Sequence, residues 1–263
     1  MGILNATPDS FSDGGKNLEP REAFQTAESM IDAGASVLDV GGESTRPGAA
    51  PVTVKEELER VIPVIKAVGE LGVQVSIDSY KPEVIKAGLD AGATWINDVT
   101  GLRDDEVVGL AVEYGVKVCI MHMQGNPQSM QNNPSYNDVV GEVRDFLKSR
   151  AEKAVDAGVS GCDVVVDPGI GFGKSLKHNL ELLRDIKSIQ DLGYPVLVGH
   201  SRKRFIGDIL GLPVEERVNA TSAVTAYLAG EDVDYVRVHD VEENMQAIRM
   251  MESIMESRNS MVN

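Results

Sequence analysis

The feature that most constrains the fold of this chain is a set of eight short apolar runs, nearly all of which end in a polar side chain. Along the sequence, the runs are Met1–Asn5, Val37–Asp39, Val73–Asp78, Thr94–Asp98, Val116–His122, Val164–Asp167, Val196–His200 and Tyr235–His239. The stretches between them are amphipathic and long enough for one helix each. This alternation predicts an α/β fold with a parallel sheet, and eight units favour a (β/α)8 TIM barrel over an open doubly wound sheet. In such a barrel, the polar strand ends face the active-site mouth.

Two of the intervening stretches show the helical pattern clearly. Residues Glu22–Ala33 place apolar side chains at helical spacing and are followed by Gly34, and Glu56–Leu71 do the same before Gly72. No linker or low-complexity segment interrupts the sequence. A single domain is therefore expected over residues 1–263.

Charge and composition restrict the possible partners. The formal net charge of −16 disfavours nucleic acids and anionic membrane surfaces. No apolar run approaches the roughly 20 residues of a membrane helix. The start of the sequence lacks a signal-peptide pattern, so a cytoplasmic protein is expected. We also expect Cys119 and Cys162 to be buried, reduced thiols.

Acid and amide side chains at strand ends suggest recognition of a flat heterocycle. These residues are Asp78, Asn97, Asp98 and Asp167. A carboxylate that accepts two parallel N–H bonds suits the 2-amino-4-oxo-pyrimidine edge of guanine or a pterin, and an asparagine satisfies mixed donor and acceptor positions. Carboxylates beside such a ring also stabilise positive charge that develops on it. Each aspartate alone is equally typical of a helix cap or a turn.

Several loops are longer or richer in glycine than barrel packing requires. The loops Ala6–Pro20, Gly42–Thr53 and Met123–Asn137 are long, and the first two are typical of lids or substrate clamps. The segment Asp167–Lys174, DPGIGFGK, fits no standard phosphate-loop pattern. We expect its backbone to pass under a flat ligand beside Phe172.

Basic and hydroxyl side chains late in the sequence indicate an anion site. Ser201 follows a strand and lies near a helix start, which favours a carboxylate, and Lys203 lies one turn further on. Arg237 and His239 are two residues apart on one strand face and suit a phosphate or pyrophosphate, with a buried salt bridge as the alternative. Because the protein is acidic overall, this local positive charge matters for an anionic substrate.

The distribution of histidine raises the question of a metal. His122, His200 and His239 fall at strand ends, but no histidine pair has the spacing of zinc ligands, and Asn5 stands after the first strand, where zinc hydrolase barrels carry such a pair. Mg²⁺ that bridges a diphosphate, with Asn5 as a protein oxygen ligand, is the better expectation.

Eight motifs in order along nearly the whole chain resemble those of dihydropteroate synthases, the folate-pathway enzymes that sulfonamides inhibit. They are MGILNATPDSFSDGG at Met1–Gly15, GGESTRPGA at Gly41–Ala49, SIDSYKP at Ser76–Pro82, WINDVTG at Trp95–Gly101, MHMQGNPQSMQ at Met121–Gln131, DPGIGFGK at Asp167–Lys174, SRKRFIG at Ser201–Gly207 and RVHD at Arg237–Asp240. Each motif is modestly specific, whereas the eight together are very specific.

The resemblance implies a magnesium-dependent condensation in a pterin-binding barrel. p-Aminobenzoate would attack the methylene carbon of 6-hydroxymethyl-7,8-dihydropterin diphosphate, with C–O cleavage leading, to give 7,8-dihydropteroate and pyrophosphate. It implies a pterin site of Asp78, Asn97, Asp167 and Lys203, a metal and pyrophosphate ligand at Asn5, a pyrophosphate site of Arg46, Arg237 and His239, and an aminobenzoate pocket of Thr45, Pro47, Phe172, Ser201 and Lys203. The catalytic group would comprise Asp78, Asp167, Lys203, Arg237 and His239, in a homodimer.

Some residues and some alternatives lie outside this picture. His200 and Arg204 stand where small or uncharged residues are common in the family, and Asp39, Asp98 and His200 receive no substrate role. A methyltransferase that moves a methyl group from methyltetrahydrofolate to a corrinoid shares the pterin floor, but it has no need of the STRPGA loop or the Arg-x-His pair. A non-catalytic pterin-binding protein on the same scaffold would not need Lys203.

Overall fold

A computed structural model of the chain describes residues 1–6, 20–44 and 50–260. The strands are β1 (Gly2–Asn5), β2 (Val37–Gly41), β3 (Gln74–Asp78), β4 (Trp95–Asp98), β5 (Lys117–Met121), β6 (Val164–Asp167), β7 (Leu197–Val198) and β8 (Tyr235–Val236). The helices are α1 (Pro20–Asp32), α2 (Val54–Gly69), α3 (Pro82–Asp90), α4 (Asp105–Tyr114), α5 (Val139–Asp156), α6 (Leu176–Arg184), α7 (Lys187–Gln190), α8 (Arg204–Leu210), α9 (Val218–Gly230) and α10 (Val241–Ser260), with 3-10 turns η1 (Gly161–Asp163) and η2 (Val214–Glu216).

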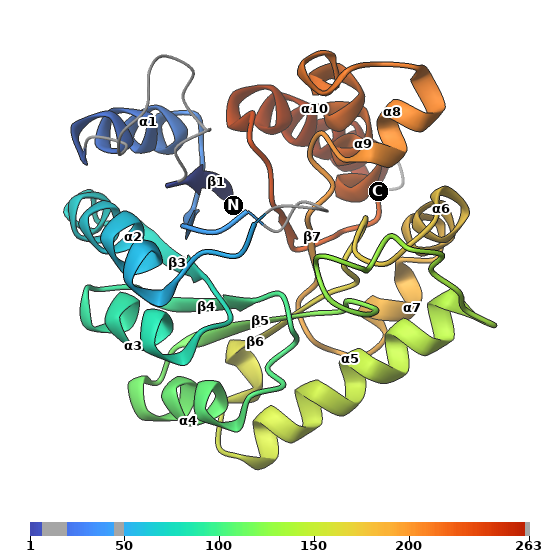
Figure 1. Ribbon diagram of the computed structural model, residues 1–263. Helices are drawn as coiled ribbons and strands as arrows, with labels where there is room; N and C mark the ends of the chain where they lie inside the picture. The colour runs from blue at the N-terminus through green and yellow to red at the C-terminus, as the bar shows by residue number, and fades with distance from the viewer. Residues whose placement is uncertain (7–19, 45–49, 261–263) are drawn as a thin grey trace.

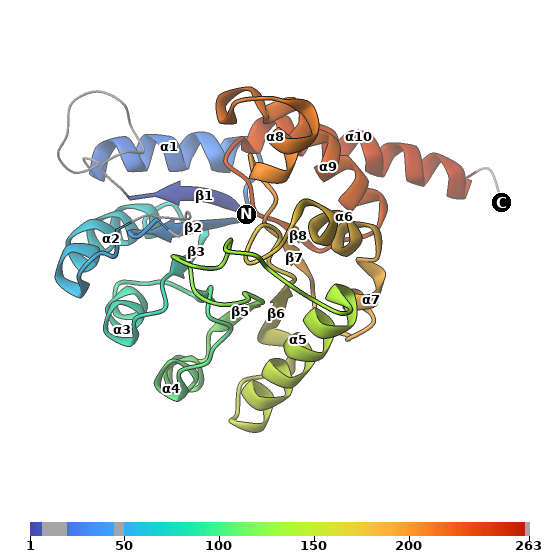
Figure 2. The same cartoon turned by 45° about the vertical axis from the view of Figure 1, so that its right-hand side comes forward.

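The strands follow one another around a ring. β1 to β6 form a parallel sheet in chain order, and β7 pairs with β8. Two further parallel bridges, Val166–Val196 and Gly2–Val238, connect these two sheets on both sides, each with a backbone hydrogen bond of 2.9 Å. The helices lie outside the strands, also in chain order (Figure 1). Figure 2 shows the same ring turned, with α10 extending away from the strands toward the C-terminus. The predicted (β/α)8 barrel is confirmed.

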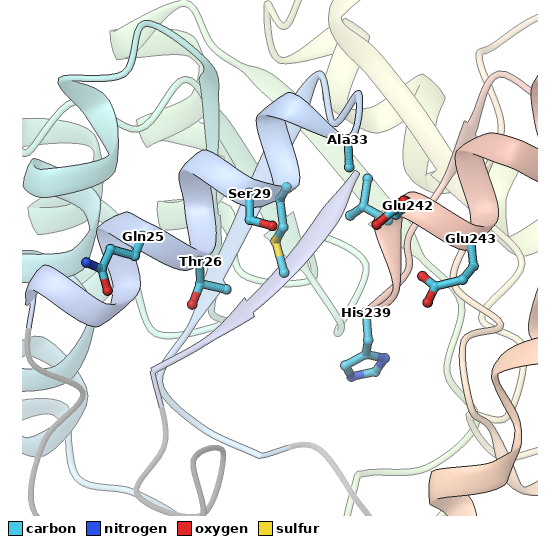
Figure 3. Close-up of a pocket in the computed structure, with 9 residues that line it drawn as sticks. Gln25, Thr26, Ser29, Ala33, His239, Glu242 and Glu243 are labelled. Atoms are coloured by element: carbon cyan, nitrogen blue, oxygen red, sulfur yellow. The ribbon is translucent and has the colours of Figure 1, made fainter.

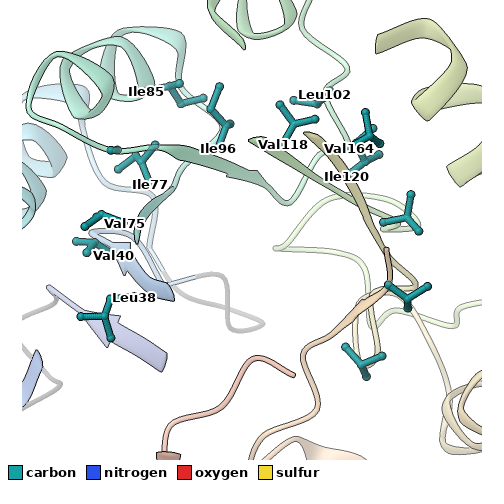
Figure 4. Packing of buried hydrophobic residues seen from close by; sticks show 14 of the residues in the cluster. Leu38, Val40, Val75, Ile77, Ile85, Ile96, Leu102, Val118, Ile120 and Val164 are labelled. Atoms are coloured by element: carbon teal, nitrogen blue, oxygen red, sulfur yellow. The ribbon is translucent and has the colours of Figure 1, made fainter. Parts of the chain in front are cut away.

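Side chains alternate between the two sides of the barrel wall, as the two-residue period of a strand requires. On β5, Val118 and Ile120 join the main core between strands and helices, which Figure 4 shows. Cys119 between them joins a second cluster inside the ring, to which six strands or their ends contribute: Met1, Val37, Trp95, Cys119, Val165 and Leu197. The barrel is therefore packed solid below its mouth.

The same alternation decides which polar strand-end residues face the interior. Because Trp95 faces inward, Asn97 two residues later also faces inward, whereas Asp98 faces the helices. The position of Asp39 differs from the one that the sequence suggested. β2 continues through Gly41, so Asp39 lies in the middle of a strand, completely buried below the mouth.

The two helices that the sequence predicted begin slightly earlier than the apolar pattern. α1 starts at Pro20, and α2 starts at Val54 because Thr53 caps it. The Thr53 hydroxyl accepts the Glu56 N–H at 3.3 Å, and the Glu56 carboxylate accepts the Thr53 N–H at 3.0 Å.

The prediction of two buried thiols was correct only for Cys119. Cys162 lies in η1, a short turn before β6 that faces solvent, and its side chain is exposed.

Candidate active site

A buried network of charges lies inside the mouth of the barrel. Arg237, just after β8, donates a hydrogen bond from Nε to Asp39 Oδ2 at 2.5 Å and from Nη2 to Asp78 Oδ2 at 2.6 Å. Asn97 Nδ2 donates to the same Asp39 oxygen at 3.1 Å. Residues from four strand segments therefore meet at one place, although up to 198 positions separate them in the chain.

Asp78 is the more exposed of the two carboxylates in this network, with 14% of its side chain exposed against none of the Asp39 side chain. Burial raises its pKa, repulsion from Asp39 raises it further, and the Arg237 guanidinium opposes both, with the result that the pKa of Asp78 is about 7. Gly41 on β2 keeps space beside this carboxylate, because a Cβ there would lie 3.4 Å from Asp78 Oδ2. Asp78 can therefore change its charge near neutral pH.

A second acid–base pair, Asp167 and Lys203, lies close to this network. A Cβ on Gly199 would lie 3.8 Å from Asp167 Oδ2 and 3.9 Å from both Lys203 Nζ and Arg237 Cβ, so these three residues surround one small space. Burial raises the pKa of Asp167 and lowers that of Lys203 to about 7, while each charge favours the ionised form of the other. The mouth thus holds acceptors and donors in close alternation.

The glycine-rich segment after β6 folds back against β5 and against Lys203. Gly169 has a φ of 67°, and a Cβ there would collide with the His122 carbonyl oxygen. This close approach places Phe172 under Lys203, whose Nζ lies 4.4 Å from the ring centroid and donates to the Ile170 carbonyl. The backbone of this segment and Phe172 therefore lie beside Lys203, and the expectation that they bind a flat ligand stays a prediction.

The loop between β7 and α8 is joined to the loop after β8. Ser201 Oγ lies 2.9 Å from His239 Nδ1 and accepts the His239 backbone N–H at 3.2 Å. Arg202 has a φ of 55°, a left-handed conformation that costs energy in a residue with a side chain. Its Nε donates to Asp240 Oδ2 at 2.9 Å, which ties the strained turn to the start of α10. These hydrogen bonds hold the turn that carries Ser201 and Lys203 in one conformation.

The remaining predicted site residues are placed in part. Asn5 ends β1, half-buried, and pairs in register with Gly41 on β2. Thr45, Arg46 and Pro47 lie outside the described residues, as do parts of the two early loops.

Three polar residues near strand ends have structural partners instead. Asp98 accepts hydrogen bonds from the turn that follows β4, at 2.7 Å from the Thr100 N–H and 3.0 Å from the Leu102 N–H. His200 Nε2 lies 2.8 Å from the Thr225 hydroxyl in α9, which explains its burial. Arg204 is exposed and pairs with Asp208 at 3.4 Å.

Two residues around the site received no role from the sequence. Asp39 contacts Arg237 and Asn97 from the middle of a strand. Lys174 is 3% exposed, and its Nζ lies 3.0 Å from His122 Nδ1. Burial and the nearby lysine charge lower the pKa of His122 to about 3. Neither contact follows from spacing, because both depend on how distant strands pair.

A pocket of about 460 Å³ adjoins the site on the outside of the barrel. Figure 3 shows Gln25, Thr26 and Ser29 along α1, opposite Glu242 and Glu243 at the start of α10, with His239 at its lower edge. His239 is thus shared between this pocket and the mouth. The concentration of buried polar groups lies in the mouth rather than here.

Within the part of the chain that the structure describes, no cluster of three or more histidine, cysteine or acidic side chains has the arrangement of a metal site. In the same residues, no helix is both long enough and apolar enough to span a membrane.

Comparison with known proteins agrees with the geometry of the mouth. The model of the pterin binding enzyme family matches residues 1–239. Dihydropteroate synthase of Escherichia coli (strain K12) is 44% identical over 259 residues, which cover 98% of this chain and 92% of that protein. The chain belongs to the dihydropteroate synthase family of pterin binding enzymes.

Solved structures of this family share the fold closely. The Yersinia pestis dihydropteroate synthase, solved with a sulfonamide drug, superposes with a TM-score of 0.92 at 42% identity and covers 97% of this chain and 93% of that one. The Thermus thermophilus enzyme in complex with 4-aminobenzoate gives a TM-score of 0.87 at 45% identity, with 96% and 93% covered. Family membership therefore extends over the whole barrel, including the segments that carry the buried network.

Proposed function

We propose that this chain is a dihydropteroate synthase that condenses 6-hydroxymethyl-7,8-dihydropterin diphosphate with p-aminobenzoate. The observation that carries the proposal is the buried alternation of acids and donors in the mouth: Asp78, Asn97, Asp167, Lys203 and Arg237. It stands in a chain whose dihydropteroate synthase relatives match over nearly their whole length.

In this proposal the pterin ring binds among the buried polar groups. The carboxylates of Asp78 and Asp167 accept hydrogen bonds from the ring N–H groups, and Asn97 and Lys203 match its mixed positions. Two carboxylates beside the ring also stabilise the positive charge that develops on the pterin as the diphosphate leaves. Arg237 forms an ion pair with Asp78, so it belongs to the pterin site as well as to the proposed site of the leaving diphosphate.

The reaction needs positioning and charge more than a nucleophile from the protein. The bond between the pterin methylene carbon and the diphosphate oxygen breaks, the aniline nitrogen of p-aminobenzoate bonds to that carbon, and the nitrogen then releases one proton. Arg46, Arg237 and His239 would hold the departing diphosphate. Holding both substrates together removes much of the entropic barrier.

A magnesium ion fits the donor chemistry at the end of β1. Asn5 supplies a neutral carboxamide oxygen there, and hard oxygen ligands from a few side chains together with phosphate oxygens are what Mg²⁺ prefers. When bound, the ion would neutralise charge on the diphosphate leaving group.

The aminobenzoate would bind across the mouth from the diphosphate. The Thermus thermophilus relative was solved with this compound, which supports the assignment. Phe172 offers a ring face beside Lys203, and Ser201 lies on the turn before α8, where a carboxylate is favoured. Thr45 and Pro47 complete this pocket in the proposal.

The proposal extends to the whole molecule. Residues 1–263 form one domain, two copies form a homodimer, and the protein works in the cytoplasm on small molecules. Its net charge of −16 supports the absence of nucleic-acid and membrane partners.

A turnover assay tests the proposal directly. Purified protein is supplied with the pterin diphosphate, p-aminobenzoate and Mg²⁺, and both dihydropteroate and pyrophosphate are measured. We expect the two products in equal amounts, and we expect chelation of Mg²⁺ to abolish both.

Two results would contradict this proposal. Tight pterin binding without dihydropteroate formation would indicate a binding protein, and methyl transfer from methyltetrahydrofolate to a corrinoid would indicate the methyltransferase class.

A further inference from the structure

Asp39 is a buried carboxylate that the proposed reaction does not use. It lies in the middle of β2 with no exposed surface, and its Oδ2 accepts hydrogen bonds from Arg237 Nε and Asn97 Nδ2. Its Oδ1 and the hydroxyl of Ser76, its register partner on β3, have no hydrogen-bond partner within the described residues. A buried carboxylate destabilises the fold unless it is paired and hydrogen-bonded, so the contacts of Asp39 must explain why it is there.

The contact with Asn97 fixes the direction of an amide. A carboxylate oxygen only accepts hydrogen bonds, so the group of Asn97 that faces Asp39 must be the NH₂. The carboxamide oxygen of Asn97 is then presented on the other side. For a ligand with an ordered row of donors and acceptors, such as a pterin edge, this direction decides whether Asn97 matches or opposes it.

The contact with Arg237 fixes a cation in the same way. Asp39 holds Nε at 2.5 Å while Asp78 holds Nη2 at 2.6 Å, so the planar guanidinium spans the two carboxylates. One carboxylate therefore sets the orientation of residues on β4 and after β8, which are 58 and 198 positions away in the chain.

Burial alone does not produce such contacts. Asp98 is equally buried, but it faces the helices, and among the described residues its hydrogen bonds come from the turn that follows its own strand. It provides a matched control, because it has the same side chain and the same exposure and lies one strand from Asp78.

We propose that Asp39 is a positioning residue of the pterin site, which locks the amide of Asn97 in one orientation and holds Arg237 against Asp78. This proposal rests on the proposed function, because it takes the ligand to be a pterin. Asp39 acts through these two side chains and does not itself touch the reacting atoms.

The first test compares Asp39→Asn with Asp98→Asn by calorimetric binding of 6-hydroxymethylpterin, which carries no phosphate. An asparagine at position 39 both donates and accepts, so Asn97 can turn over, and Arg237 loses a charged partner. We expect Asp39→Asn to weaken pterin binding about 10- to 100-fold, the size of a lost hydrogen bond to a charged group. Asp98→Asn should lower thermal stability and change pterin affinity less than about twofold.

A kinetic comparison separates positioning from a general loss of structure. The hydrogen bonds of Asp39 go to Arg237 and Asn97, not to Phe172 or Ser201. Asp39→Asn should therefore raise the KM for the pterin diphosphate or lower kcat, while the KM for p-aminobenzoate changes less than about twofold. Equal loss for both substrates would mean that Asp39 only supports the fold, and unchanged pterin binding in a folded Asp39→Asn protein would overturn the proposal.

A double-variant comparison tests the route of action. In an Asn97→Ala background, Asp39→Asn should cost clearly less affinity than it does in the wild type, because part of its effect has already been removed. Losses that multiply would contradict the proposal. If Asp39→Asn does not fold, Asp39→Ser replaces it: the shorter side chain keeps one acceptor oxygen, and we again expect pterin binding to weaken relative to the wild type. Pterin binding is measured without turnover, so a wild type that binds pterin but makes no dihydropteroate would disprove the function and leave the role of Asp39 measurable.

Discussion

At the scale of single residues, Asp78 and Lys203 lose a proton in the same pH range, so Asp78 gains its charge where Lys203 loses its own. Burial is the largest influence on both: it raises the pKa of Asp78 and lowers that of Lys203, and both reach about 7. The charged groups that act on them are Asp39, Arg237, Glu57 and Asp98 for Asp78, and Asp167, Arg237 and Asp78 for Lys203. Below about pH 7 Asp78 loses its negative charge, and above it Lys203 loses its positive charge.

Pterin affinity should therefore be greatest near pH 7 and should fall on both sides. On the acid side, Asp78 must lose its proton before it can accept hydrogen bonds from the ring N–H groups. Affinity should therefore fall by up to about tenfold per pH unit. On the alkaline side Lys203 no longer offers a cation. Calorimetric binding of 6-hydroxymethylpterin at values from about 1.5 pH units below this maximum to about 1.5 above it would reveal the bell shape.

Two variants assign the limbs of this profile. Asp78→Asn should flatten the acid limb, and Lys203→Met should flatten the alkaline limb, each with weaker binding overall. If Asp78→Asn kept the acid limb, another group would carry it, and the role of Asp78 would be wrong.

At the scale of elements, Lys174 joins the segment after β6 to the end of β5. Its Nζ donates to the Phe172 carbonyl at 2.9 Å and to the His122 carbonyl at 3.3 Å, and it lies 3.0 Å from His122 Nδ1. Burial lowers the pKa of Lys174 well below its usual value, and the nearby Asp167 carboxylate opposes this shift. The backbone that carries Phe172 is held to the barrel by this side chain and by Tyr136, whose hydroxyl donates to the Gly173 carbonyl oxygen at 2.8 Å.

Lys174→Met should loosen this segment while it keeps the volume of the side chain. Two buried carbonyl groups lose a donor, so we expect the free energy of unfolding to fall by about 1–3 kcal/mol in denaturant titrations. The KM for p-aminobenzoate should rise, because Phe172 is less well placed.

The matched control is Lys177→Met on α6, since 80% of that lysine side chain is exposed and its contact with Glu181 is a surface pair. It should leave stability and both KM values unchanged. An unaltered KM for p-aminobenzoate in Lys174→Met would mean that Phe172 is positioned by other contacts.

At the scale of the whole molecule, the sequence predicted the barrel and most of its mouth because both follow from local periodicity. An apolar run that ends in Asp78 or Asp167 marks the end of a parallel strand whose last side chain faces inward. In the run that ends in Asp98, the same two-residue period aims Asn97 inward instead. The sequence places Asp39 at a strand end, but β2 continues two residues beyond it, because nothing local distinguishes a buried mid-strand carboxylate from a strand end. Its partners become neighbours only when the ring closes.

Burial of His200 depends on the same closure and makes the stability of the molecule sensitive to acid. The imidazole lies between β7 and α9 with no exposed surface, and burial lowers its pKa from 6.5 to about 4, although the carbonyls of Val198 and Thr221 partly oppose this shift. Above pH 6.5 the residue is neutral in the folded and unfolded chains, so its protonation does not change the free energy of unfolding. As the pH falls from 6.5 to about 4, the unfolded chain binds a proton that the folded chain does not, and stability decreases.

We expect His200 to lower the free energy of unfolding by about 1.4 kcal/mol for each pH unit in that range, with no further decrease at lower pH. Asp78 contributes in the opposite sense, since its raised pKa favours the folded state at low pH, so the total slope alone cannot identify the histidine. His200→Gln removes the titrating group and retains a polar side chain near the Thr225 hydroxyl. The difference between wild type and variant in urea titrations across this range therefore isolates the histidine: it should shrink steadily as the pH falls, and a constant difference would show that His200 does not titrate on unfolding.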